Sequence, residues 1–338
     1  MSGIEPMISF PTFRNMVLVS TLSAGAAFAQ SQNVAFHKTF PVLASESVVL
    51  EADISQADLQ ISYSRDGQIT VTASAKAIDG SPLDPDFFEK SLHLEQIGNR
   101  FSLRQDPSSV DRSRKVHVAL TIDVPYRTEL TSNVAQGRQA ITGIMGPVHA
   151  TSGQGDIQIS YIAKGVDARA DTGNLDLQVI GEHVAASAGV GNISCTRIAQ
   201  GANAETADGD ITLTVVGSSS ALVRKGSGRA DVNGAQGSLT VSTDAGELHV
   251  KAEPHGNWKI NSASGNLRLE LPARARFELD ASTDSGNLQP ERDDLRAPEP
   301  GTRHFSQIVN NQTVITHIAN NPAPRIEAHT GSGRIVIR

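Results

Sequence analysis

The hydrophobic positions of this chain follow a pattern that repeats around a recurring glycine. The stretch "GDIQIS" begins at Gly155, and equivalent glycines return every 18 to 21 residues as far as Gly286. Random glycines do not keep such a step, so the chain contains a true internal repeat. The later anchors are Gly173, Gly191, Gly209, Gly228, Gly246, Gly265 and Gly286, with a last one at Gly333.

Positions two and four residues after each anchor are non-polar in every copy, whereas the position between them is nearly always polar. This period of two predicts a β-strand with one buried face. The residues two after the anchor are Ile157, Leu175, Ile193, Ile211, Ala230, Leu248, Leu267, Leu288 and Ile335. The residues four after it are Ile159, Leu177, Cys195, Leu213, Val232, Val250, Leu269, Pro290 and Ile337.

A second strand is predicted before each glycine, with its own inward positions. Seven residues before the anchor stand Val148, Val166, Val184, Ala202, Ala221, Leu239, Trp258, Leu279 and Ile326. Five before it the residues are smaller: Ala150, Ala168, Ala186, Ala204, Val223, Val241, Ile260, Ala281 and Ala328. Each unit is therefore a strand, a tight glycine turn, a second strand and a short return.

Units of this length predict the fold class. They are too short for a βαβ unit, which needs a helical crossover, but they suit one coil of a solenoid in which each strand pairs with its copy in the next coil. We therefore expect an all-β protein, a single-stranded parallel β-helix or β-solenoid with coils of about 18–19 residues. Each inward Leu or Ile would contribute about 1.5–3 kcal/mol when fully buried.

The coils are expected to form a single domain that follows a cleaved leader. The stretch "SQADLQISYSRDGQITVTASA" repeats the pattern, with Leu59 and Ile61 in the places of Ile157 and Ile159. The segment "SLHLEQIGNRFSLRQ" is typical of a hairpin around Gly98-Asn99. The predicted organisation is 1–29 signal peptide, 30–338 β-solenoid domain, 36–147 irregular coils with a hairpin insertion at 79–115, 148–290 regular coils, and 291–338 a loop, a last hairpin in "SQIVNNQTVITHI" and a closing coil.

The N-terminus has the features of an export signal. Arg14 precedes the apolar run "MVLVSTLSAGAAFA", which ends in a small-x-small pattern at Ala27-Phe28-Ala29. The run is short and interrupted by Ser and Thr, so it would not span a bilayer comfortably. Cleavage near Ala29 and a location outside the cytoplasm are predicted; an uncleaved anchor is the alternative.

Composition narrows the function classes. The net charge is −7 and the basic residues are scattered, which argues against nucleic-acid binding because that needs a basic stripe. The single cysteine, Cys195, excludes an intramolecular disulfide. Packing and backbone pairing must therefore hold the fold together.

The chain resembles the putative-adhesin, β-strand-repeat family of exported bacterial proteins, a domain family of unknown function. The resemblance rests on "VALTIDVP", on the run of "G-[DN]-[IL]-x-[IVL]" coils and on the closing "TGSGRIVI". It covers about residues 36–338 and implies a parallel β-helix in the cell envelope, with no catalytic residues to carry over. One departure is Lys225, which stands where small residues face inward and predicts a distorted coil.

Acidic residues at the turns are the first candidates for chemistry. Asp156 follows its anchor directly, and Asp or Asn recurs in that column, where such side chains bond nearby backbone amides. We interpret Asp156 as a structural corner residue. Calcium binding is the alternative, because β-rolls with coils of this length place carboxylates at turns. The residues concerned are Asp171, Asp208, Asp210, Asp244, Asp284 and Glu247.

Other candidate groups have structural interpretations that we prefer. Arg224, Lys225 and Arg229 are interpreted as a solvated basic edge rather than a lyase site, and Trp258 and Cys195 as core residues. The histidines show no metal-binding spacing, with His149, His183 and His329 at outward or loop positions. The serines of "SGxG" lack a matching His and Asp in fixed order.

The sequence thus predicts a non-enzymatic, exported structural or adhesin-like protein of the cell envelope. No catalytic, cofactor-binding or metal-binding residue is assigned, and the expected partner is an envelope component, a cell surface or a glycan. The alternative is a polysaccharide-binding or polysaccharide-cleaving β-helix protein; a cleft lined by three or more carboxylates beside Arg or Lys would favour the cleaving enzyme. Because the last strand runs to Arg338, an exposed end suggests end-on association.

Overall fold

The structure is a computed structural model that describes residues 33–42, 47–106, 116–217, 221–296, 302–309 and 323–338. The predicted signal peptide (residues 1–29) and its cleavage site near Ala29 lie outside the described residues. Among the residues that are described, no helix is long and apolar enough to cross a membrane.

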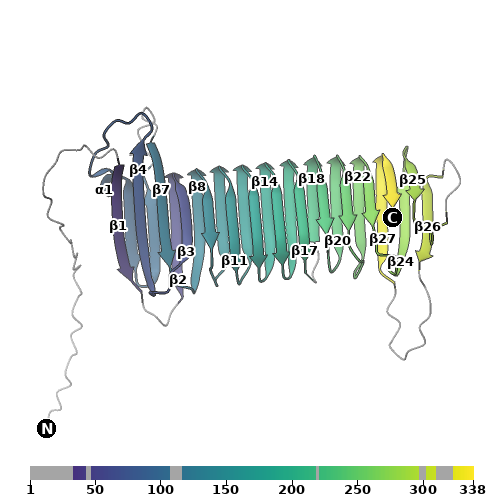
Figure 1. The fold of residues 1–338 in the computed structure, drawn as a ribbon, viewed down its shortest axis with the longest axis horizontal. Coiled ribbons are helices and arrows are strands. Elements are labelled where there is room, and N and C mark those ends of the chain that lie inside the picture. The colour runs from purple at the N-terminus through teal and green to yellow at the C-terminus, as the bar shows by residue number, and fades with distance from the viewer. Residues whose placement is uncertain (1–32, 43–46, 107–115, 218–220, 297–301, 310–322) are drawn as a thin grey trace, which may run out of the picture. The chain divides into compact units, whose positions relative to one another are not determined.

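Two long sheets make up the described part of the chain, each with 14 strands (Figure 1). In spatial order the first sheet, sheet A, contains β1 (Asn33–Pro41), β4 (Gln68–Ala77), β7 (Val116–Val124), β3 (Asp58–Tyr63), β9 (Gln139–Thr142), β11 (Ile157–Ile162), β13 (Leu175–Ile180), β15 (Ile193–Ile198), β17 (Ile211–Val216), β19 (Ala230–Asn233), β21 (Leu248–Lys251), β23 (Leu267–Glu270), β28 (Arg334–Ile337) and β25 (Asn287–Pro290). The second sheet, sheet B, contains β26 (His304–Val309), β24 (Phe277–Thr283), β27 (Arg325–Ser332), β22 (Trp258–Ser264), β20 (Leu239–Ala245), β18 (Ala221–Ser227), β16 (Gly201–Asp208), β14 (His183–Val190), β12 (Val166–Thr172), β10 (Val148–Gln154), β8 (Thr128–Gln136), β2 (Val48–Gln56), β6 (Arg100–Gln105) and β5 (Leu92–Ile97).

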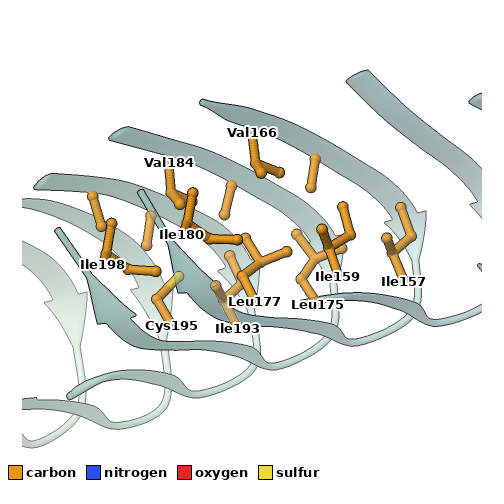
Figure 2. Close-up of a cluster of buried hydrophobic side chains, with 14 of the residues drawn as sticks. Ile157, Ile159, Val166, Leu175, Leu177, Ile180, Val184, Ile193, Cys195 and Ile198 are labelled. Atoms are coloured by element: carbon orange, nitrogen blue, oxygen red, sulfur yellow. The ribbon is translucent and has the colours of Figure 1, made fainter. Parts of the chain in front are cut away.

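Each regular coil gives one strand to each sheet, and equivalent residues of successive coils lie side by side in parallel register. Ile157 pairs with Leu175 and Leu175 with Ile193, while Val148 pairs with Val166 and Val166 with Val184. Figure 2 shows the inward side chains of Ile157, Leu175, Ile193, Val166 and Val184 in the space between the two sheets. The predicted all-β solenoid is confirmed, and so is the superposition of its hydrophobic columns.

The core narrows toward the glycine turn, where small and hydroxyl side chains replace the large ones. Thr206 is buried, and its Oγ1 donates to the carbonyl oxygen of Gly191 at 3.1 Å. Thr330 makes the same bond to Gly265 at 3.0 Å. Each hydroxyl therefore satisfies a carbonyl of the neighbouring coil at the bend. Lys225 occupies this column by backbone pairing with Thr206 and Thr243, but its side chain lies outside the described residues, so the predicted distortion stays a prediction.

Glycine at the anchor is required by both backbone conformation and space. Gly173 has a φ of 147°, which L side chains rarely adopt. A Cβ added there would collide with the carbonyl oxygen of Gly155 in the previous coil. The recurring glycines therefore permit the coils to stack closely at the turn.

Strict alternation fails near the far end of three neighbouring sheet A strands, β11, β13 and β15. Tyr161, Val179 and Arg197 occupy equivalent positions and have φ values of 58°, 56° and 57°. Such left-handed residues turn the chain, so that Ile162 is buried although it follows buried Ile159 by three residues. The same bend recurs in the next two coils, which shows that it is built into the repeat.

The N-terminal coil, β2–β3, is not the first in space. Strand β3 lies between β7 and β9, and β2 lies between β6 and β8. Leu59 pairs with Gln139, and Ile61 with Ile141, which in turn pairs with Ile159, so the predicted equivalence of these columns is confirmed. Gly137 has a φ of 133° and is the anchor of an additional coil that the sequence pattern missed.

The C-terminal coil, β27–β28, is also inserted between earlier ones. Trp258 pairs with Ile326, and Ile326 with Leu279, so β27 separates β22 from β24 (Figure 1). Strand β28 likewise lies between β23 and β25. The expectation that the strand reaching Arg338 forms an exposed end is therefore wrong, because both of its edges are paired.

Antiparallel strands cover most of the sheet ends. Strands β5 and β6 form an antiparallel hairpin around Gly98, whose φ is 61°. Beside it, the short helix α1 (Phe87–Ser91) places Phe88 against Phe36, with ring centroids 6.0 Å apart. Strand β26 pairs antiparallel with β24, and the remainder of the predicted last hairpin, residues 310–322, lies outside the described residues.

Candidate functional site

The acidic and amide residues after the anchor glycines form a ladder between coils. Asp156 Oδ1 accepts the backbone N–H of Asn174 at 2.8 Å, and Asn174 Oδ1 accepts that of Asn192 at 2.9 Å. The series continues from Asn192 to Asp210 at 2.7 Å and from Asp210 to Arg229 at 2.8 Å. These side chains satisfy backbone donors at the turn, which is the corner role that the sequence indicated for Asp156.

The turn carboxylates named as calcium candidates are not gathered into a metal-type cluster. Within the described residues, no group of three or more His, Cys, Asp or Glu side chains is placed to hold a metal ion. Asp208 instead accepts the hydroxyl of Ser227 at 3.2 Å. The hydrogen bonds of Asp208 and Asp210 link neighbouring coils.

Cys195 and Trp258 are both core residues. Burial, and secondarily the charge of Asp176, raise the pKa of the Cys195 thiol to about 12, so its thiolate is strongly disfavoured. Trp258 is 1% exposed, and its Nε1 donates to the carbonyl oxygen of Gly237 at 3.1 Å. Neither side chain is presented to a ligand.

The proposed basic edge is only partly described. Arg229 forms an ion pair with Asp231 at 2.7 Å, while the side chains of Arg224 and Lys225 lie outside the described residues. The hydrogen bond and charge of Asp231 raise the pKa of Arg229. Arg229 is thus an exposed, paired cation.

The structure brings together one Ser–His–Asp set that sequence order did not suggest. His329 Nδ1 lies 3.0 Å from Ser282 Oγ, and its Nε2 lies 3.8 Å from Asp284 Oδ2. The Asp284 side chain is 75% exposed. An acid this solvated does not hold an imidazole as the buried aspartate of a catalytic triad does, so we assign no nucleophile here. Of the other histidines, His149 lies 3.9 Å from Asp167, and the ring of His183 lies where a Cβ added to Gly165 would meet it at 3.3 Å.

A charged groove of about 960 Å³ lies over strands β21, β23, β28 and β25 of sheet A. We call it the His249 groove, because His249 bridges two carboxylates: Asp231 at 3.2 Å and Glu270 at 3.3 Å. Burial alone would raise the pKa of Glu270, but a hydrogen bond from Arg268 and the charge of His249 hold it below its usual value. Only two carboxylates, Glu247 and Glu270, are among the residues described as lining this groove.

A second groove, of about 530 Å³, lies on the outer face of sheet A over strands β7, β3, β9, β11 and β13. Ala140 is flanked in the neighbouring strands by Gln60 and Gln158, so a short side chain between two long ones hollows the face. We call this the Ala140 groove. Its volume lies within the usual range of ligand sites.

Three carboxylates and one arginine line the turn end of the Ala140 groove. They are those of Asp58, Asp156 and Asp176, with Arg138. Asp58 accepts the backbone N–H of Arg138 at 3.0 Å, and Asp176 accepts the side-chain amide of Gln178 at 2.9 Å. A cleft with three or more carboxylates beside Arg or Lys is the sequence-based sign of a cleaving enzyme, and this groove meets that count. Asp58, Asp156 and Asp176, however, each accept a hydrogen bond from a neighbouring residue.

Together, the coils, the glycine turns and the coil-to-coil ladder define a β-solenoid with polar outer faces. The chain belongs to the Toastrack DUF4097 family, whose sequence profile matches residues 160–338. This confirms the resemblance to an adhesin-like family of unknown function. No curated protein matches the chain.

Three solved structures are similar to the chain over 90% of its length. A putative cell adhesion protein from Clostridium sporogenes is 10% identical with a TM-score of 0.23, covering 98% of that chain. A putative adhesin from Bacteroides fragilis is 12% identical with a TM-score of 0.31, covering 97% of that chain. A putative lipid binding protein from Parabacteroides distasonis is 8% identical with a TM-score of 0.31, also covering 97% of that chain. Likenesses this weak carry no argument about the ligand of this chain.

Sequence reasoning missed the outer face of sheet A as a candidate surface. It looked for exposed aromatic residues and considered only Trp258, although Tyr63 and Tyr161 occupy the same place in their coils, four residues after Leu59 and Ile157. That shared position was the available signal. It was hidden because the intervening coil, anchored at Gly137, was not recognised.

Proposed function

We propose that the protein is a non-enzymatic, exported structural or adhesin-like component of the cell envelope that binds its partner through the outer faces of the solenoid. The observation that carries this proposal is the ladder in which Asp156, Asn174, Asn192 and Asp210 each accept a backbone N–H of the next coil. The two carboxylates of this ladder, Asp156 and Asp210, are engaged in holding the stack together.

Two further observations support a non-catalytic role. Cys195, the one thiol of the chain, is fully buried and its pKa is raised to about 12, so it is a poor nucleophile. The carboxylate beside Ser282 and His329 is 75% exposed. Export is supported by the leader pattern ending at Ala29.

The second candidate function is the binding or cleavage of a polysaccharide. The Ala140 groove favours it, because Asp58, Asp156, Asp176 and Arg138 gather along its edge. Cleavage needs an acid that gives up its proton to the leaving group. Three aspartates held as hydrogen-bond acceptors favour binding over cleavage.

The test separates location, binding and catalysis. Cells that produce the protein are fractionated, and the purified protein is then mixed with envelope fractions and with a panel of polysaccharides. We expect it in the envelope or medium with its leader removed near Ala29, sedimenting with envelopes and releasing no new reducing ends. Cytoplasmic retention or failure to bind envelopes would refute the first candidate. Release of reducing ends that Asp58→Asn abolishes would establish the enzyme instead.

A further inference from the structure

All three tyrosines of the chain are exposed, and they belong to one neighbourhood. Tyr63, Tyr126 and Tyr161 are 41%, 48% and 63% exposed. Tyr63 ends β3, Tyr161 lies near the end of β11, and Tyr126 follows β7. Tyrosine usually buries much of its ring, so the exposure of every copy at one place calls for a functional reason. We call this set the tyrosine cluster.

Backbone pairing sets the positions of Tyr63 and Tyr161 on the two coils that flank the coil of β9. Ser62 pairs with Thr142, which pairs with Ser160, so Tyr63, Gly143 and Tyr161 follow at equivalent positions. A Cβ on Gly143 would lie 3.2 Å from the Cβ of Tyr63, so a larger residue there would crowd that ring. Two strand spacings place the backbones of Tyr63 and Tyr161 about 10 Å apart, a span similar to two pyranose rings of an extended polysaccharide.

The third ring extends this platform. The rings of Tyr63 and Tyr126 make an edge-to-face contact with centroids 5.1 Å apart. The carbonyl oxygen of Tyr126 accepts the backbone N–H of Met145 at 3.0 Å, which ties this segment to the coil of β9. Strands β3, β9 and β11 therefore carry the tyrosine cluster near one end and the Ala140 groove near the other.

Side chains with hydroxyl groups lie between the tyrosine cluster and the Ala140 groove. Ser62 donates to Asp123 at 2.6 Å, and Ser160 donates to Thr142 at 3.0 Å. Gln60 and Gln158 stand two positions before Ser62 and Ser160 on the same outer face. Side-chain hydroxyls, amides and carboxylates here can exchange hydrogen bonds with a polyhydroxylated ligand, while exposed tyrosine rings offer apolar faces for stacking.

We propose that an extended neutral polysaccharide stacks on the tyrosine cluster and crosses β3, β9 and β11 in the direction from Tyr63 to Tyr161, with the polar Ala140 groove beside it. This deepens the proposed function by naming the ligand class and its site. Aspartates outnumber arginine in the groove by three to one, so an acidic glycan would be repelled. A stable protein partner would need an apolar core within about 1,000 Å² or more of interface, whereas the outer-face residues next to the rings, Ser62 and Ser160, carry hydroxyls.

The direct test uses purified protein and soluble polysaccharides as probes. Retardation in gels containing hydroxyethyl cellulose, xylan, glucomannan or laminarin, followed by calorimetry with the corresponding oligosaccharides, measures binding. Alginate and polygalacturonate are the acidic comparison. We expect at least one neutral probe to bind and both acidic probes to fail. Binding to no neutral probe, or tighter binding to the acidic ones, overturns the proposal.

Variants then locate the site. Tyr63→Ala and Tyr161→Ala should each weaken binding about tenfold, because each removes an apolar ring face that a bound sugar would cover. Tyr161→Phe should retain most of the affinity, since the ring remains. Val190→Ala is the matched control, because Val190 is a 53% exposed apolar residue on the other sheet. Equal affinity of Tyr63→Ala, Tyr161→Ala and the parent protein overturns the proposal even if binding is observed.

A gain-of-function variant guards against losses caused by misfolding. Val179 lies beside Tyr161 in the next coil and shares its left-handed backbone, with φ values of 56° and 58°. Val179→Tyr should therefore fold and add a stacking surface, raising the affinity for longer oligosaccharides several-fold but not for disaccharides. A uniform loss of affinity would contradict the proposed direction of the bound chain.

Treatment of the envelope fractions separates this inference from the proposed function. If periodate oxidation of the envelopes removes binding and protease treatment does not, the partner is a glycan as inferred. If protease removes binding and periodate does not, the neutral-glycan site is wrong while the envelope role stands. If untreated envelopes are not bound and a neutral probe is, the site stands and the envelope role fails.

Discussion

The carboxylate of Asp156 accepts a hydrogen bond of 2.8 Å from the backbone N–H of Asn174, one full coil further along the chain. Asp156→Ala should lower the free energy of unfolding by about 1 kcal/mol, because that donor loses its partner. Asp156→Asn should retain most of the stability, since an amide oxygen accepts in the same way in the next coil. Urea denaturation measures both. Gln158→Ala, an exposed change two residues away, is the control and should stay within about 0.5 kcal/mol.

Gly173→Ala should destabilise the protein far more than an ordinary glycine substitution. The added Cβ would strike the carbonyl group of Gly155, and the φ of 147° is strained for any L side chain. We expect a loss of about 3 kcal/mol or more, measured by the urea midpoint. Gly67→Ala is the comparison: its φ is 63°, but its Cβ would enter open space. That variant should lose only about 1–2 kcal/mol, and equal losses would contradict the stacking argument.

Val179→Asn should stabilise the protein. Val179 is β-branched and has a φ of 56°, a conformation that costs such residues about 1–3 kcal/mol and that asparagine adopts readily. After the loss of some apolar contact we expect a net gain of about 0.5–1 kcal/mol. Gln178→Asn, at the preceding position, should show no gain. A melting temperature that falls with Val179→Asn would mean that the left-handed residue is not strained.

Cys195 should resist thiol reagents until the protein unfolds. Burial is the main cause of its raised pKa of about 12, and the charge of Asp176 adds to it. At pH 8 the folded protein should not react with a thiol-specific chromogenic disulfide, whereas protein in concentrated urea should react with one equivalent. Rapid reaction of the folded protein would show that the column between the sheets opens in solution.

Asp280 should contribute to the acid sensitivity of the C-terminal coils. A hydrogen bond from His304 is the main cause of its lowered pKa; burial opposes the shift, and a further bond from Arg325 supports it. Because the folded-state pKa lies below the ordinary value of 3.8, this stabilisation is present above that pH and is lost as the pH falls through the folded value.

Asp280→Asn tests this linkage. The variant should be less stable than the parent at pH 7, by at most about 1 kcal/mol because the pair is partly solvated. The difference should disappear as the pH falls below 3.8. Urea midpoints across this range measure it, and Asp284→Asn, whose carboxylate is 75% exposed, is the matched control. A constant difference at every pH would exclude the carboxylate as the cause.

The sequence predicted which residues face the core because alternation and the glycine step record burial directly. Ile157, Leu175 and Ile193 stack in register as expected. The coil at Gly137 was missed because its first inward position is Gln139, a residue whose burial depends on partners that only the fold provides. Its Oε1 accepts the hydroxyl of Ser132 at 2.7 Å.

Coil order and backbone strain could not be predicted from the pattern. Trp258, Leu279 and Ile326 all fit one column, so the pattern places them on one face without saying which are neighbours. The left-handed residues Tyr161 and Val179 are not of types that favour that conformation, so nothing local signals it. The Ala140 groove depends on coil order, because it forms where β3, β9 and β11 lie side by side, and the tyrosine cluster depends on coil order and on left-handed Tyr161 as well.

The inserted C-terminal coil constrains how the molecule can be assembled during synthesis. Strands β22 and β24 are made before β27, yet in the finished fold each pairs with β27 instead of with the other. The part of the solenoid that contains them cannot be completed while residues 325–337 are still to be made. A polypeptide that stops before Arg325 would leave open strand edges on both sides of the gap, where unfinished chains could join one another. Residues 325–337, which are made after both of their neighbouring coils, thus close this part of the fold.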